Sequence, residues 1–157
     1  MGPLRILALA PIVGRDWVAV LAVMAMAGVL SLLPLQGVPS GPTGADKIAH
    51  FVLYAVLAFV TCRAAGKSAG RPGRGRDRRQ RAPRAPAAIV ATGFAVAVVF
   101  GGAMEWLQGA VGRDPSWGDL FANAAGAAAG AAIWWLRHAR QRRISGVTNL
   151  EAGRPYE

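Results

Sequence analysis

The residues able to do chemistry fall in three short polar blocks, each at the end of a long apolar segment. The blocks are Asp46, Lys47, His50 and Tyr54, then Glu105 and Gln108, then Arg113, Ser116, Asp119 and Asn123. Carboxylates and imidazole act as general acids and bases, whereas lysine and arginine bind phosphate or carboxylate groups. Because polar side chains are costly in lipid, these blocks indicate either contacts between helices or a functional site.

We weigh three chemistries for these blocks. In the first, Glu105 or Asp119 is the acid or base and His50 its partner, so these three are the candidate catalytic residues. The residues assigned to substrate binding are Asp46, Lys47, Tyr54, Gln108, Arg113, Ser116 and Asn123. In the second, the same residues bind a lipid intermediate or carry protons without changing a bond. Whether the chain is an enzyme stays open between these two.

In the third chemistry, His50, Glu105 and Asp119 coordinate a divalent ion. No helix offers a pair of histidines, so we assign no metal and no cofactor. A purely structural role competes with all three, because Ser116 can cap a helix, and Asn123 and Gln108 can join helices by hydrogen bonds.

The composition indicates a membrane protein, in which these blocks would be positioned by transmembrane helices. Hydrophobic residues make up 54% of the 157 residues, charged residues only 17%, and the charges are clustered. Long apolar runs between short charged loops are typical of polytopic membrane proteins. The net charge of +10 is interpreted as topology and lipid contact, not nucleic-acid binding, because no aromatic-interleaved basic motif accompanies it.

The apolar runs predict an all-α bundle of four transmembrane helices. Their expected spans are about 17–35, 46–64, 87–108 and 116–136, each close to the length needed to cross a bilayer. Residues 1–16 form a cytoplasmic lead, 66–86 a disordered basic linker and 137–157 a basic cytoplasmic tail. A signal peptide is the alternative for the first span, but its apolar run continues past the cleavage-like Ala25-Met26-Ala27.

The distribution of positive charge predicts the orientation. With four spans, sixteen of the 18 lysines and arginines lie on the side of the termini, and only Lys47 and Arg113 on the other. Both termini are therefore expected in the cytoplasm. The three polar blocks then meet on the extracytoplasmic side of the membrane.

The last span carries a stripe of residues at steps of three and four. The stripe runs through Ser116, Asp119, Asn123, Gly126 and Gly130, so its N-terminal part is polar and its C-terminal part is glycine. Glycines four apart let another helix approach closely, and we assign Gly126 and Gly130 to helix packing within the chain.

In sequence order, the blocks read D-K-x-x-H-x-x-x-Y, E-x-x-Q and R-x-x-S-x-x-D-x-x-x-N-x-x-G-x-x-x-G. This pattern resembles the VanZ-like family of small bacterial membrane proteins, over residues 17–136. The resemblance implies a bacterial cytoplasmic membrane and a link to the cell envelope or to tolerance of the antibiotic teicoplanin, without a settled mechanism.

Together these observations predict a membrane protein that acts on or binds a cell-envelope ligand at an outward-facing polar pocket. Membrane lipid and a lipid-linked cell-wall precursor or glycopeptide are the expected partners. Nucleic acid is not expected, and the oligomeric state stays open. The alternatives are a small proton-coupled carrier and a non-catalytic structural protein.

Overall fold

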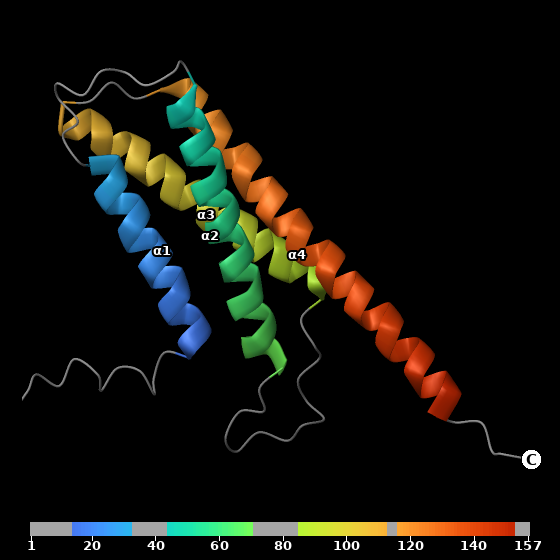
Figure 1. Cartoon of the computed structure of the whole chain (residues 1–157). Coiled ribbons are helices and arrows are strands. Elements are labelled where there is room, and N and C mark those ends of the chain that lie inside the picture. The colour runs from blue at the N-terminus through green and yellow to red at the C-terminus, as the bar shows by residue number, and fades with distance from the viewer. Residues whose placement is uncertain (1–13, 33–43, 71–84, 113–115, 153–157) are drawn as a thin grey trace, which may run out of the picture.

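The computed structural model describes residues 14–32, 44–70, 85–112 and 116–152. These residues form four helices and no other regular element, so the described chain is all-α (Figure 1). The helices are α1 (Arg15–Leu32), α2 (Ala45–Gly70), α3 (Pro86–Ala110) and α4 (Trp117–Ala152). Arg113 lies outside the described residues.

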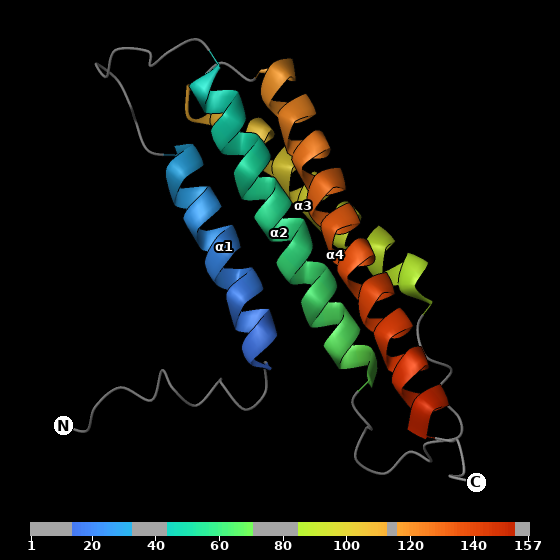
Figure 2. The same ribbon diagram turned by 45° about the vertical axis from the view of Figure 1, so that its right-hand side comes forward.

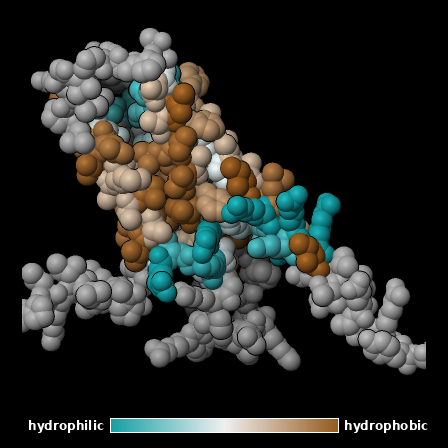
Figure 3. Space-filling model, in the orientation of Figure 1, coloured by the Kyte–Doolittle hydropathy of each residue, from teal (hydrophilic) through white to brown (hydrophobic). Residues whose placement is uncertain are grey.

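Three of the helices are long and apolar enough to cross a membrane, namely α1, α2 over Ala45–Ala69, and α3. Large hydrophobic side chains such as Val99 and Leu21 are exposed on them. The middle of the face in Figure 3 is mostly hydrophobic, as expected of a surface that contacts lipid. The fourth helix of the predicted bundle is present, but α4 is less apolar because it carries Asp119, Asn123 and many small residues.

The helix α2 lies at the centre of the bundle and contacts the other three helices. The helix α4 packs against α2 and α3, whereas α1 packs against α2 and α3 but not against α4 (Figure 2). The main core consists of side chains from all four helices, with Tyr54, Leu57 and Ala97 fully buried.

Glycines allow α2 to approach α4 closely. A Cβ atom at Gly126 would overlap the carbonyl oxygen of Phe51, and one at Gly130 would overlap that of Ala55. The backbones of α4 and α2 are therefore in direct contact over two successive turns. This contact fixes how far the polar side chains of α4 lie from those of α2.

The helices beside the linker extend into the segment that was expected to be disordered. The first residues of the linker expected to be disordered, 66–70, continue α2, and residue 86 begins α3. Lys67 pairs with Asp16 at 2.8 Å, and Ser68 accepts a hydrogen bond from Trp17 Nε1 at 3.0 Å, so contacts with α1 hold this turn. The remaining linker residues, 71–84, lie outside the described residues.

The helix α4 continues from the expected end at residue 136 as far as Ala152. Much of the tail predicted for 137–157 is thus helical. Alanine, arginine and glutamine dominate its first turns, from Arg137 to Arg143, and all three are good helix formers. Loss of hydrophobicity marks where a helix leaves the apolar layer, not where the helix ends.

Candidate functional site

The polar blocks meet where α2 and α4 begin and α3 ends, which we call the polar end of the bundle. Because α3 runs opposite to α2 and α4, its last turns lie beside their first turns (Figure 1). The prediction that sequence-distant blocks converge therefore has a simple geometric basis. The contacts that each polar side chain makes differ, as follows.

The imidazole of His50 on α2 is joined to Asn123 on α4. His50 Nδ1 lies 2.9 Å from Asn123 Oδ1, and Asn123 is only 1% exposed. The ring of Tyr54, one turn further along α2, is nearly parallel to that of His50, with centroids 6.2 Å apart. Gly101 on α3 faces Tyr54 and Asn123, since a Cβ there would lie 3.0 Å from Tyr54 and 3.1 Å from Asn123 Nδ2.

Glu105 on α3 is 7% exposed and points toward the start of α4. Its Oε2 accepts a hydrogen bond from the backbone N–H of Ser116 at 3.2 Å. The first N–H groups of a helix have no partner within the helix and carry partial positive charge, so a carboxylate there is stabilising. Ser116 thus meets the cluster through its main chain.

Asp119 on α4 faces Lys47 on α2. Lys47 Nζ lies 3.8 Å from Asp119 Oδ1 and 3.3 Å from Asp46 Oδ2. The longer distance is an ion pair but not a hydrogen bond, so Asp119 Oδ1 has no hydrogen-bond donor among the described residues although it is buried. The side chain of Asp46 is 57% exposed and lies at the rim.

The three candidate catalytic residues lie together at the centre of the polar end. One ligand atom from each of His50, Glu105 and Asp119 can be chosen so that all three lie within 4.8 Å of one another. Within the described chain, two buried donors beside them, Tyr54 Oη and Asn123 Nδ2, have no hydrogen-bond partner. Buried donors normally have partners, so these two groups are available to donate hydrogen bonds to an oxygen atom of a bound ligand.

Gln108 belongs to the same polar block as Glu105 but faces another helix. Its Nε2 donates to the carbonyl oxygen of Ser31 on α1 at 3.0 Å, and it is 4% exposed. The structure therefore places Gln108 at the contact between α3 and α1, apart from the hydrogen bonds around His50. Arg113 was predicted as an anion ligand and lies outside the described residues.

Two residues at the polar end carry no chemistry of their own and were missed from the sequence. Gly101 makes room for Tyr54 and Asn123, and the Gly101-Gly102 pair within an apolar span is the signal that could have drawn attention to it. Ser31 contributes a carbonyl oxygen, for which the sequence holds no signal.

Comparison of the chain with protein-family models, curated proteins and solved structures found no match. The resemblance to the VanZ-like family therefore stays a prediction.

Proposed function

We propose that this chain is a multi-pass membrane protein that binds a divalent cation at His50, Glu105 and Asp119. The cation then holds an oxygen-bearing ligand of the bacterial cell envelope, either lipid-linked or related to glycopeptides. The sequence alone led us to assign no metal. The observation that carries the present proposal is the grouping of one potential ligand atom from each of three helices within 4.8 Å. Three elements that far apart in sequence make a preorganised site, because their relative positions are fixed by helix packing.

The charge at the polar end supports a cation more than an anion. Among the described residues, Asp46, Glu105 and Asp119 supply three carboxylates and Lys47 supplies one ammonium group. Lys47 is already shared between Asp46 and Asp119. A phosphate or carboxylate placed directly against Glu105 and Asp119 would be repelled. A bound divalent ion would cancel the net negative charge of this cluster and offer an anionic oxygen an open coordination position.

The ligand types suit a transition metal. One imidazole nitrogen and two carboxylate oxygens are ligands that zinc, iron and manganese accept, and they leave coordination positions open. When His50 Nδ1 carries the proton and donates to Asn123 Oδ1, Nε2 keeps the lone pair that a metal needs. Asn123 is then the group that orients the imidazole.

The two unpaired donors support binding of an oxygen atom beside the metal. Tyr54 Oη and Asn123 Nδ2 are both buried, and Tyr54 is close enough to Glu105 to interact with it electrostatically. A phosphate, carboxylate or water oxygen on the metal would give these donors their missing partner. The positive charges at the opposite end of the bundle favour an extracytoplasmic position for this site, where envelope precursors and glycopeptides are met.

A purely structural role is the second candidate, and two contacts favour it. Glu105 already accepts the Ser116 N–H, and Gln108 already joins α3 to Ser31 of α1. In this alternative the buried polar groups only hold the helices together, and no ligand is needed. The chain could instead be a proton-coupled carrier that uses the same three residues without a metal, since carboxylates and imidazole also relay protons.

Metal analysis of the full chain, purified in detergent without chelators and then supplied with zinc or manganese, tests the proposal. We expect close to one divalent ion per chain, and its loss in Glu105→Gln and Asp119→Asn. The matched control is Asp46→Asn, which removes an exposed carboxylate at the same end but keeps the three ligands. Absence of stoichiometric metal from the folded wild type would overturn the cation site and leave the structural role.

The envelope ligand needs a separate measurement. Lipids that co-purify from bacterial membranes with the wild type are compared with those on Glu105→Gln and Asp46→Asn. A polyprenyl phosphate or glycolipid retained by the wild type and Asp46→Asn, and lost from Glu105→Gln together with the metal, is the expected result. Equal retention by all three proteins would contradict a ligand held through the metal.

A further inference from the structure

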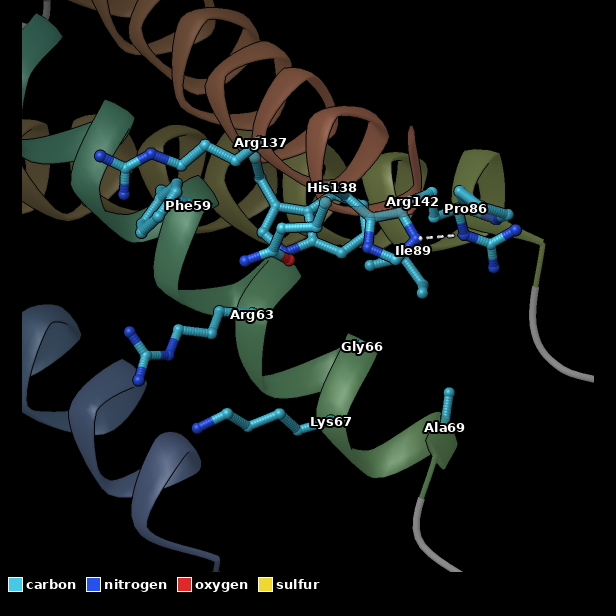
Figure 4. A pocket seen from close by; sticks show the side chains of 12 residues that line it. Phe59, Arg63, Gly66, Lys67, Ala69, Pro86, Ile89, Arg137, His138 and Arg142 are labelled. Carbon is cyan, nitrogen blue, oxygen red and sulfur yellow. Dashed lines mark hydrogen bonds between the residues drawn. The ribbon is translucent and has the colours of Figure 1, made fainter. Parts of the chain in front are cut away.

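A cavity lies at the end of the bundle opposite the polar end, where α2 ends, α3 begins and α4 passes both (Figure 4). We call it the basic pocket. It has a volume of about 610 Å³ and is lined by Phe59, Arg63, Gly66, Lys67, Ala69, Pro86, Ile89, Trp134, Arg137, His138, Gln141 and Arg142. None of these lining residues is a carboxylate, whereas four are cations.

The wall of the basic pocket is apolar and aromatic. Ile89 and Trp134 are buried in a second core cluster, and the indole of Trp134 stacks on His138 with centroids 5.0 Å apart. Phe59 adds a ring from α2. A small hydrophilic ion alone would leave these surfaces uncovered, so the lining suits a ligand with both an apolar part and a charged part.

The cations stand around this apolar wall on two different helices. The Arg137 guanidinium lies 5.5 Å from the centre of the Phe59 ring, and Arg142 Nε donates to His138 Nε2 at 3.1 Å. Neither partner is a carboxylate, so neither interaction neutralises the charge of the arginine. In Figure 4, Arg142 lies on the side of the pocket where Pro86 begins α3.

On α2, the two cations are partly neutralised from outside the pocket. Arg63 and Lys67 extend toward α1, where both pair with Asp16, at 3.3 Å and 2.8 Å. One carboxylate facing two cations leaves a net positive charge there. The start of α3, whose N-cap residue Ala85 offers no capping side chain, adds partial positive charge. The end of α2 adds partial negative charge of similar size, so the two helix ends leave the net charge of the pocket unchanged.

We propose that the basic pocket binds the phosphate ester of an anionic phospholipid, with the phosphate at Arg142 and the acyl part against Trp134 and Phe59. Arg137 adds positive charge from the opposite side of the pocket. The positive-inside rule puts this end at the cytoplasmic leaflet, where anionic lipids supply the negative surface charge. Guanidinium groups bind phosphate oxygens through directed hydrogen bonds, which an ammonium group cannot match. The site does not depend on the metal site proposed above, since the two lie at opposite ends of the bundle.

Native mass spectrometry of the full chain, titrated in detergent with phosphatidylglycerol or phosphatidylcholine, tests this inference. We expect phosphatidylglycerol to bind more tightly, and the double variant Arg137→Gln/Arg142→Gln to weaken its binding by about tenfold or more, since each basic group near a lipid phosphate contributes on the order of fivefold. The matched control is Arg140→Gln/Arg143→Gln. It removes the same charge from exposed positions of α4 that do not line the pocket.

A third variant, Ala69→Trp, fills the pocket without changing its charge, and we expect it to weaken phosphatidylglycerol binding as well. It keeps the test decisive if the double arginine variant fails to fold. Soluble glycerol phosphate serves as competitor, and no displacement at a hundredfold excess is expected because it has no apolar part. Displacement would show that a free phosphate ester is the ligand and overturn the lipid. Equal weakening by the two double variants, or no weakening by Ala69→Trp, would overturn the pocket.

Discussion

Replacing Gly126 by alanine tests whether backbone contact between α4 and α2 sets the geometry of the polar end. The added Cβ would overlap the Phe51 carbonyl oxygen. A backbone carbonyl inside a helix cannot rotate aside as a side chain can, so α4 must move away from α2 by on the order of an ångström, to reach ordinary van der Waals contact. That movement would pull Asn123 from His50, whose atoms lie 2.9 Å apart.

The size of the effect follows from two opposing contributions. Overpacking a well-packed contact costs about 1–3 kcal/mol. The higher helix propensity of alanine returns up to about 1 kcal/mol, less in a membrane where the helix persists on unfolding. We therefore expect Gly126→Ala to lower the free energy of unfolding by about 1–2 kcal/mol. In the Gly126→Ala background, Gly130→Ala should lower the free energy of unfolding by less than it does in the wild type, because α4 has already moved away from α2.

The assay is unfolding of the purified chain in mixed micelles with increasing sodium dodecyl sulfate, followed by circular dichroism. Gly102→Ala is the matched control, because that glycine also lies inside a helix but nothing lies within 4 Å of the position that an added Cβ would take. Zinc binding is measured on the same samples and should weaken only in Gly126→Ala. Equal stability of the Gly126 and Gly102 variants would refute the argument that the two backbones are in contact.

Three further outcomes are expected. Asn123→Leu removes the partner of His50 and should weaken zinc binding by about 10–100-fold in competition with a chromogenic chelator; unchanged affinity would mean that Asn123 does not orient the imidazole. Gln108→Met removes the hydrogen bond to Ser31 and should lower the free energy of unfolding by about 0.6–1.7 kcal/mol while leaving zinc affinity unchanged. A strong chelator should destabilise a wild type previously held at a hundredfold excess of zinc over its dissociation constant by about 2.7 kcal/mol. The same treatment should leave His50→Ala unaffected, and a response there would place the metal elsewhere.

The sequence was sufficient to predict the helices and the end at which the polar blocks lie. Four apolar segments separated by charged or glycine- and proline-rich stretches must alternate in direction, which brings Glu105 near His50 and Asp119. It was not sufficient to predict which helix each polar side chain faces. Glu105 and Gln108 are three positions apart, so they differ by about 60° around α3. That rotation is enough to send one to α4 and the other to α1.

The basic pocket was hidden for a different reason. His138 and Arg142 belong to turns of α4 beyond the end expected from hydrophobicity, so their helical contacts with Trp134 had no place in that prediction. The same excess of arginine also has a sufficient explanation in membrane topology. A pocket depends on which side chains three helices bring together, and that arrangement is not encoded in the charge pattern alone.

The central position of α2 has a consequence for the order in which the protein is made. His50 and Asn123 are 73 positions apart, so at a translation rate of about 5–20 residues per second the ribosome needs about 4–15 s to supply the partner of His50. During this interval the carbonyls of Phe51 and Ala55 lack the glycines that later cover them. Only the last helix to emerge covers the polar face of α2, so a nascent chain stalled before α4 leaves His50 and these carbonyls without their native partners.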